Sequence, residues 1–198
     1  MKHITSLIIL FLIFQTSNGQ TKLVQDYKSL FNTADSLNKL GKDFSLDTAL
    51  LIELHDLDAQ VPSSYLEQSL RLFDAHNFDE AAVLYYIGLI RHQYYISTNS
   101  NYAPNEDWIN AESMKAVYGK KFDFVLKTNI EKYILVLKLA TEYCEKNDYL
   151  LSPKQNNLEK YNSQIDTFKK LIVEYTNNKE TYIKEWSEER KTLLSEVK

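Results

Sequence analysis

Glycine and proline are scarce in this chain. Its 198 residues contain only four glycines and three prolines, whereas average usage gives about 12% for the two together. Domains rich in β-structure use many turns, and turns consume these two residues, so the shortage favours helices. Between residues 23 and 40, large apolar residues recur every three or four positions, which is the spacing of one helix face. We therefore predict an all-α fold, a single-domain bundle of about six to eight helices.

Turn residues and apolar spacing together place the expected helices. One helix occupies 23–40 and stops at Gly41, and a short helix begins after Ser45 or Asp47. The others are expected at 62–77 from Pro62, at 78–96, at 108–118 with a stop at Gly119, at 122–147 as one long helix, and from Pro153 to the end. Asn177 and Asn178 leave open whether that last segment is one helix or two. The helix over 78–96 is apolar on almost every face, so we expect it at the centre of the bundle.

The first 19 residues have the three-part layout of a secretory signal peptide. A short basic start at Lys2 precedes an uncharged run over 4–14, and the small residues Ser17 and Gly19 precede Gln20. Eleven helical residues span about 16 Å, too little for a hydrocarbon core of about 30 Å, which argues against the alternative of a membrane anchor. No cysteine lies near the cut, which argues against a lipid anchor. We predict a signal peptide at 1–19, a single α-helical domain at 20–198, and export to the periplasm or the extracellular space.

Charge narrows the range of partners. Removal of residues 1–19 takes away Lys2 and no acidic residue, so 22 basic residues face 27 acidic ones and the formal charge changes from −4 to −5. Nucleic-acid binding needs a concentrated basic face, and attraction to anionic lipid needs positive charge. We therefore expect no nucleic-acid partner and no stable membrane insertion after signal cleavage.

The middle of the chain carries a repeat-like pattern. Aromatic and large residues stand at Tyr65, Leu72, Phe78 and Tyr85, and small residues stand at Ser69, Ala81 and Gly88. Residues 65–88 thus resemble one degenerate tetratricopeptide-repeat unit, a hairpin of two helices. The resemblance implies a TPR-like hairpin in which the small residues let the two helices approach closely.

That pattern also departs from the repeat. Gln68 stands where the repeat usually has leucine, Gln93 stands where it often ends in proline, and no second copy follows at the expected offset. Arrays of this kind normally need three or more units. The resemblance therefore covers one hairpin and does not extend to the whole chain.

Catalytic and metal-binding motifs are absent from the sequence. His55, His76 and His92 remain after processing, but none has a second His or Cys ligand at zinc spacing, and His55 with Asp58 supplies two ligands at most. We assign no catalytic residue, no metal and no cofactor. Cys144 is the only cysteine, so it could pair with another chain, remain a reactive thiol or be a small buried hydrophobe, and we favour the last.

Two groups of residues are candidate partner-binding sites. Arg91 and His92 lie in the most apolar helix, and Arg91 there must be paired or open to a cavity. It either contacts an anion in a site lined by Tyr85, Tyr94 and Tyr95, or forms a salt bridge to an acid on a neighbouring helix. The second candidate is the loop over 97–110, whose Tyr102 and Trp108 have polar neighbours, as interface anchors often do. The alternative is that Trp108 packs into the bundle at the start of its helix.

The C-terminal segment shows a seven-residue repeat. One register contains Leu158, Ile165, Ile172, Trp186 and Leu193, with Lys179 as its exception, and the second contains Tyr161, Phe168, Tyr175 and Tyr182. This spacing is similar to a coiled-coil seam, which allows a structural dimer, but its aromatic content favours an amphipathic pair that packs on its own domain.

These features rank the possible functions. Export, a helical bundle, abundant tyrosine and the lack of a catalytic motif favour a binding or interaction protein whose partner is another protein, such as a periplasmic accessory protein or an immunity-type protein that blocks a toxin. One alternative is an enzyme with a site assembled from scattered residues around Arg91 and His92, which a cavity joining either residue to an acid would support. The other alternative is a structural dimer through the C-terminal helices.

Overall fold

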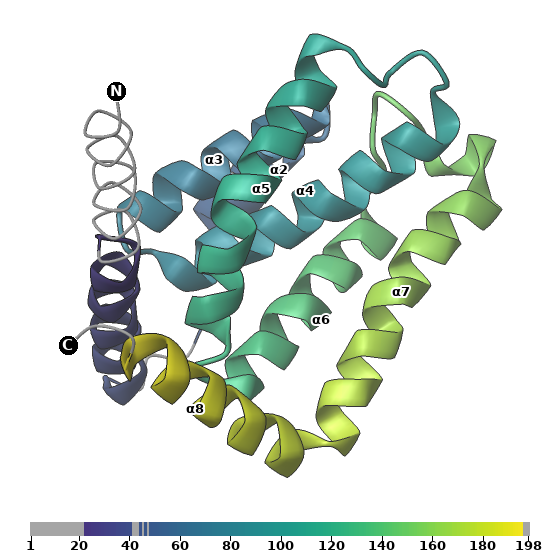
Figure 1. The fold of residues 1–198 in the computed structure, drawn as a ribbon. Coiled ribbons are helices and arrows are strands. Elements are labelled where there is room, and N and C mark those ends of the chain that lie inside the picture. The colour runs from purple at the N-terminus through teal and green to yellow at the C-terminus, as the bar shows by residue number, and fades with distance from the viewer. Residues whose placement is uncertain (1–21, 41–43, 45, 47, 196–198) are drawn as a thin grey trace, which may run out of the picture.

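The computed structural model describes residues 22–40, 44, 46 and 48–195, and across them all regular structure is helical, with no strand (Figure 1). The prediction of an all-α bundle is therefore confirmed. The predicted signal peptide at 1–19, the expected stop at Gly41 and the start signals Ser45 and Asp47 lie outside these residues.

The helices follow one another with short connections. A helix over residues 22–39 comes first. The later elements are α2 (Thr48–Leu57), α3 (Pro62–Asp74), α4 (Phe78–Thr98), α5 (Glu106–Leu126), α6 (Ile130–Lys146), the 3-10 turn η1 (Lys154–Asn156), α7 (Leu158–Asn177) and α8 (Lys179–Ser195).

Helix α4 lies at the centre of the bundle. It packs against α3, α5, α6 and α7, and most of its first 17 residues are buried, from Phe78 to Tyr94. A helix that is apolar on nearly every face has no face for water, so its neighbours must cover it all round. The expected central position of this helix is confirmed.

Helices α3 and α4 form an antiparallel hairpin with a close crossing at Gly88. A Cβ atom added to Gly88 would lie 2.8 Å from Cβ of Tyr65 and 3.0 Å from Cδ2 of Leu66. Ser69 and Ala81 are also fully buried in this hairpin. The small residues thus allow the close approach that was expected, while membership of the repeat family stays a prediction.

The boundary between α5 and α6 differs from the prediction. Gly119 does not end a helix: α5 runs from Glu106 through it to Leu126, so 108–118 is too short and a single helix over 122–147 is wrong. A Cβ at Gly119 would lie 2.9 Å from the Tyr85 hydroxyl, so this glycine makes room for a neighbour rather than a turn. The break falls at 127–129, where the Asn129 side chain accepts a hydrogen bond from the backbone N–H of Lys132 and starts α6.

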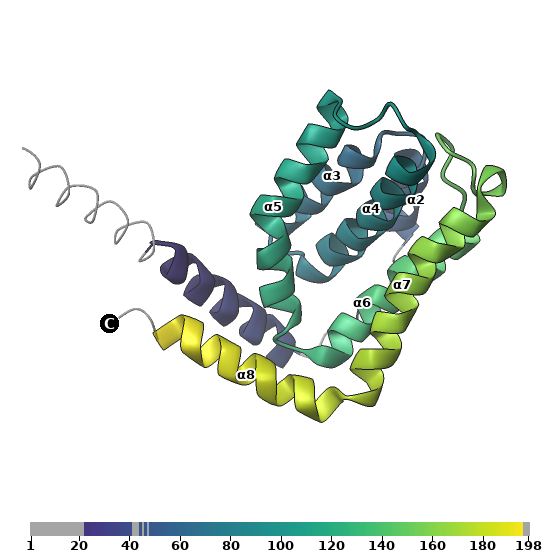
Figure 2. The ribbon, with the colours of Figure 1, turned by 45° about the vertical axis from the view of Figure 1, so that its right-hand side comes forward.

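The last segment is two helices that meet at Asn178, and both pack on their own chain. Helices α7 and α8 diverge sharply there (Figure 2). Tyr161, Ile165, Tyr175 and Trp186 of the two registers are buried in the core. The packing agrees with an amphipathic pair, which the sequence favoured over a coiled-coil seam.

The helix over 22–39 lies beside α8 and against the end of α5 (Figure 2). The Tyr27 ring lies 4.8 Å from that of Phe124, and the Arg190 guanidinium lies 5.7 Å from the ring centre of Phe31. These contacts fix one wall of the cavity described below. Among the described helices, none has the length and hydropathy required to cross a bilayer.

Candidate functional site

Arg91 is fully buried and forms an ion pair inside the bundle. Its Nη2 lies 2.8 Å from Oδ1 of Asp58, a residue that directly follows α2. Asp58 also accepts hydrogen bonds from the hydroxyls of Tyr65 at 2.6 Å and Tyr143 at 2.7 Å. The carboxylate therefore has three donors, as a buried charge requires.

The rest of the guanidinium contacts α7 and the loop after α6. Nη1 donates to the Tyr161 hydroxyl at 2.5 Å, which in turn donates to the Cys144 carbonyl at 2.5 Å, and Nη2 also donates to the Asn147 carbonyl at 3.2 Å. Arg91 Nε has no hydrogen-bond partner within the described part of the chain. The arrangement is the salt bridge to a neighbouring acid, and tyrosines pack around it.

Burial sets the protonation states in this network. It raises the pKa of the Tyr65 and Tyr143 hydroxyls well above the usual range, and the neighbouring Asp58 carboxylate raises both further. Both tyrosines therefore stay protonated as donors. Burial also raises the pKa of the Cys144 thiol to about 11, so this cysteine is a neutral, fully buried side chain.

His92 is buried beside α5 without a close partner. Its Nδ1 lies 3.7 Å from Oε1 of Glu112, which is itself paired with Lys115 at 2.7 Å. Neither ring nitrogen of His92 has a hydrogen-bond partner among the described residues. Burial, reinforced by the Lys115 charge, lowers the pKa of His92 to about 4, so the imidazole is neutral at pH 7.

The three tyrosines expected to line a site around Arg91 point to different neighbours. The Tyr85 ring stacks on that of Phe122, with 4.3 Å between the ring centres. Tyr94 donates a hydrogen bond to the Pro153 carbonyl at 3.2 Å. The Tyr95 ring packs edge-on against the Tyr102 ring, with 4.8 Å between their centres. Adjacent residues on a helix do not face each other, so Tyr94 and Tyr95 point in different directions. Tyr85 in particular lies too far along α4 to share one lining with the other two.

In the second predicted site, the loop over 97–110, both aromatic side chains are at least partly buried. Tyr102 is 3% exposed, and its hydroxyl donates to Asp107 while its ring packs on Tyr95. Trp108 is half-buried in the first turn of α5, and its backbone N–H is bonded by the Asn105 side chain at 2.8 Å. Trp108 is thus half-buried at the start of its helix, and Tyr102 is not free to act as an exposed anchor.

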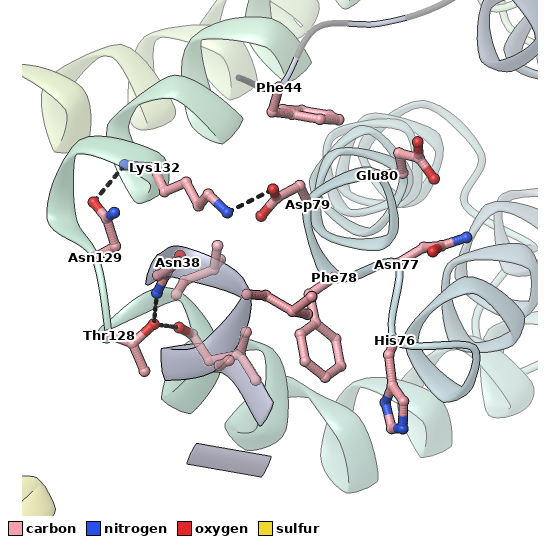
Figure 3. Close-up of a pocket in the computed structure, with 14 residues that line it drawn as sticks. Asn38, Phe44, His76, Asn77, Phe78, Asp79, Glu80, Thr128, Asn129 and Lys132 are labelled. Atoms are coloured by element: carbon pink, nitrogen blue, oxygen red, sulfur yellow. Dashed lines mark hydrogen bonds and ion pairs between the residues drawn. The ribbon is translucent and has the colours of Figure 1, made fainter. Parts of the chain in front are cut away.

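A cavity of about 270 Å³ lies elsewhere, where α4 and α6 begin beside the helix over 22–39 (Figure 3). Its polar lining is Asn38, His76, Asn77, Asp79, Glu80, Thr128, Asn129 and Lys132, and its apolar lining is Ala34, Leu37, Phe44, Phe78, Val125 and Leu126. Neither Arg91 nor His92 lines it.

Local sequence explains why both helices start at this cavity. His76 adopts a left-handed backbone conformation with φ of 63°, which turns the chain from α3 into α4. Asn129 caps α6 on the facing side. Asn38 donates to the Thr128 hydroxyl at 2.8 Å and so holds the helix over 22–39 against this second turn.

One ion pair crosses the cavity. Lys132 Nζ lies 2.7 Å from Oδ2 of Asp79, and the two side chains are only 19% and 24% exposed. In the view of Figure 3 the pair lies between the rings of Phe44 and Phe78. Charged groups, aromatic rings and amides that can both donate and accept make this a setting for a small polar ligand with an apolar part.

Sequence reasoning missed all 14 cavity residues as site residues. They come from three distant segments, and no short motif joins them. The available signal was the pair of asparagines at the helix starts, Asn77 and Asn129, but a cap alone does not indicate a cavity. Across the described chain, no group of three or more His, Cys, Asp or Glu side chains is placed to hold a metal ion.

No family model, no curated protein and no solved structure matches the chain. The cavity and the buried network are therefore the features from which a function can be argued.

Proposed function

We propose that the chain is an exported helical binding protein and that the cavity between the starts of α4 and α6 is its binding site. The observation that carries the proposal is the combination of concavity, a partly covered ion pair and aromatic walls in one place. Ligand sites are typically concave, with few polar groups among apolar ones, and at about 270 Å³ this cavity is close to the small end of their size range.

The side chain of Arg91 is already paired inside the bundle, which favours the cavity over Arg91 as the binding site. Its ion pair with Asp58 and its bond to Tyr161 would have to break before it could hold an external anion. Separating such a buried pair costs several kcal/mol, about 3–5 in typical cases. The enzyme alternative requires a cavity that joins Arg91 or His92 to an acid, and the cavity at the starts of α4 and α6 is lined by neither residue.

The partner is the remaining part of the proposal. Export rests on the signal-like residues 1–19, and with export we propose a periplasmic accessory protein or an immunity-type protein. The cavity has room for one small molecule, or for one or two side chains presented by a partner protein. We propose that the cavity binds its ligand without catalysis.

The test compares two tryptophan variants three positions apart. Leu37 lines the cavity from the helix over 22–39, whereas Leu40 directly follows that helix and is 68% exposed. Mature chain, residues 20–198, would be incubated with an extract of its own cell envelope, and retained proteins and small molecules would be identified by mass spectrometry. The proposal expects retention by wild type and Leu40→Trp and loss in Leu37→Trp, with circular dichroism confirming that all three are folded. Equal retention by a folded Leu37→Trp variant would contradict it.

A further inference from the structure

We infer that the cavity takes a small zwitterion of amino-acid size, bearing an ammonium and a carboxylate at one end and an apolar group at the other. This inference rests on the proposed function and specifies its ligand. It follows from how the Lys132–Asp79 ion pair is placed, from the size of the cavity and from its walls.

The ion pair limits the charge of the ligand. Lys132 and Asp79 neutralise each other at 2.7 Å, with about four-fifths of each side chain covered. A ligand with a single charge would bind one partner and leave the other charge unmatched in a partly buried place, which is costly. A zwitterion can place its carboxylate on Lys132 and its ammonium on Asp79, so both charges remain paired when the ligand enters.

The orientation follows from the charges of the pair. Lys132 carries an ammonium in the first turn of α6, so the ligand carboxylate belongs on that side. Asp79 lies across the cavity in the first turn of α4 and receives the ammonium. The side chains of Asn38 and Asn129 provide further hydrogen-bonding atoms at the edge of the cavity.

Size and lining limit the rest of the ligand. A volume of about 270 Å³ lies just below the range of about 300–1,000 Å³ that suits drug-sized ligands. Phe44 and Phe78 stand on opposite sides of the ion pair in Figure 3, with Leu37 and Leu126 among the other apolar walls. A ligand that fits has a single branched or aromatic side chain, as a free apolar amino acid does.

Four related compounds separate the charge requirements. Titration calorimetry of the mature chain would use L-leucine, its N-acetyl derivative with only the negative charge, its amide with only the positive charge, and N-acetyl-leucinamide with neither. We expect L-leucine to bind at least tenfold more tightly than each of the other three. Equal binding of any singly charged or neutral analogue, or binding of none of the four, would overturn the inference.

Two variants on α6 test the assigned contact. Lys132→Met should remove the preference for a carboxylate, so that leucinamide binds as well as L-leucine. Lys138→Met, at an exposed position of the same helix, should leave the preference unchanged. If Lys132→Met retains the wild-type preference, the carboxylate is not held by Lys132 and the inference fails.

The failure of this inference is distinguishable from the failure of the proposed function. If an envelope compound or protein is retained through the cavity, as judged by loss in Leu37→Trp, while L-leucine does not bind, the zwitterion is wrong and the binding role stands. If Leu37→Trp changes the binding of neither, the cavity is not the site and both are wrong.

Discussion

Replacement of Asp58 by alanine should destabilise the protein more than almost any other single change. It would leave the Arg91 guanidinium buried without its carboxylate, since Arg91 is 0% exposed and the two groups lie 2.8 Å apart. Removal of one partner from a buried pair costs about 3–5 kcal/mol. Tyr65 and Tyr143 would each lose an acceptor as well, so we expect a loss at the upper end of this range.

The expected loss is large relative to the total free energy of unfolding. Domains are typically stable by about 5–15 kcal/mol, so Asp58→Ala should be folded only marginally. The double variant Asp58→Ala with Arg91→Met removes both charges and should be more stable than Asp58→Ala alone. The difference arises because no unpaired charge remains buried in the double variant.

Urea unfolding followed by circular dichroism measures these differences, with the slope of each transition checked for a change in the denatured state. A double-mutant cycle should give a coupling of about 2 kcal/mol or more between Asp58 and Arg91. If Asp58→Ala costs under about 1 kcal/mol, or if the coupling is near zero, the internal pairing of Arg91 is not what stabilises the bundle.

Three further changes have defined outcomes. The pKa of His92 is about 4 in the folded chain and 6.5 in the unfolded chain. Between these pH values the unfolded chain binds more protons, so the free energy of unfolding falls as pH drops from 6.5 to 4. In urea titrations across that range, His92→Leu should reduce this fall by about 2 kcal/mol after allowing for solvent screening. Gly88→Ala should lower the free energy of unfolding by about 2 kcal/mol because its Cβ would meet Cβ of Tyr65 at 2.8 Å, whereas Gly119→Ala meets only the movable end of Tyr85 and should cost less; equal costs would refute the close crossing. Expression of the full-length chain in a bacterial host should yield exported protein that begins at Gln20 by N-terminal sequencing, and retention of Met1 would refute the signal peptide.

Periodic spacing was a sound guide to helices, but not to every helix end. The apolar run over 78–96 predicted a central helix because a helix without a polar face needs neighbours on all sides, and the structure places it there. The helix end predicted at Gly119 was wrong because glycine can either stop a helix or allow a close neighbour. Only the fold shows that the Tyr85 hydroxyl lies against Gly119. The true break depends on Asn129, a capping residue that the apolar pattern around it obscured.

Site residues were harder to predict than helices. Arg91 was correctly recognised as a charge that needs a partner, but Asp58 lies 33 positions earlier, and sequence spacing does not indicate which acid pairs with it. The cavity brings Asn38, Asp79 and Lys132 together from three elements. Such a juxtaposition is a property of packing, so no local pattern predicts it.

Backbone amide NMR shifts during a titration of the mature chain with L-leucine test binding at this cavity most directly. We predict that the amides of residues 77–80 and 129–132 move with one common saturation curve, while those around Arg91 and His92 stay in place. Shifts that cluster around Arg91 instead, or an unchanged spectrum at millimolar L-leucine, would contradict the account.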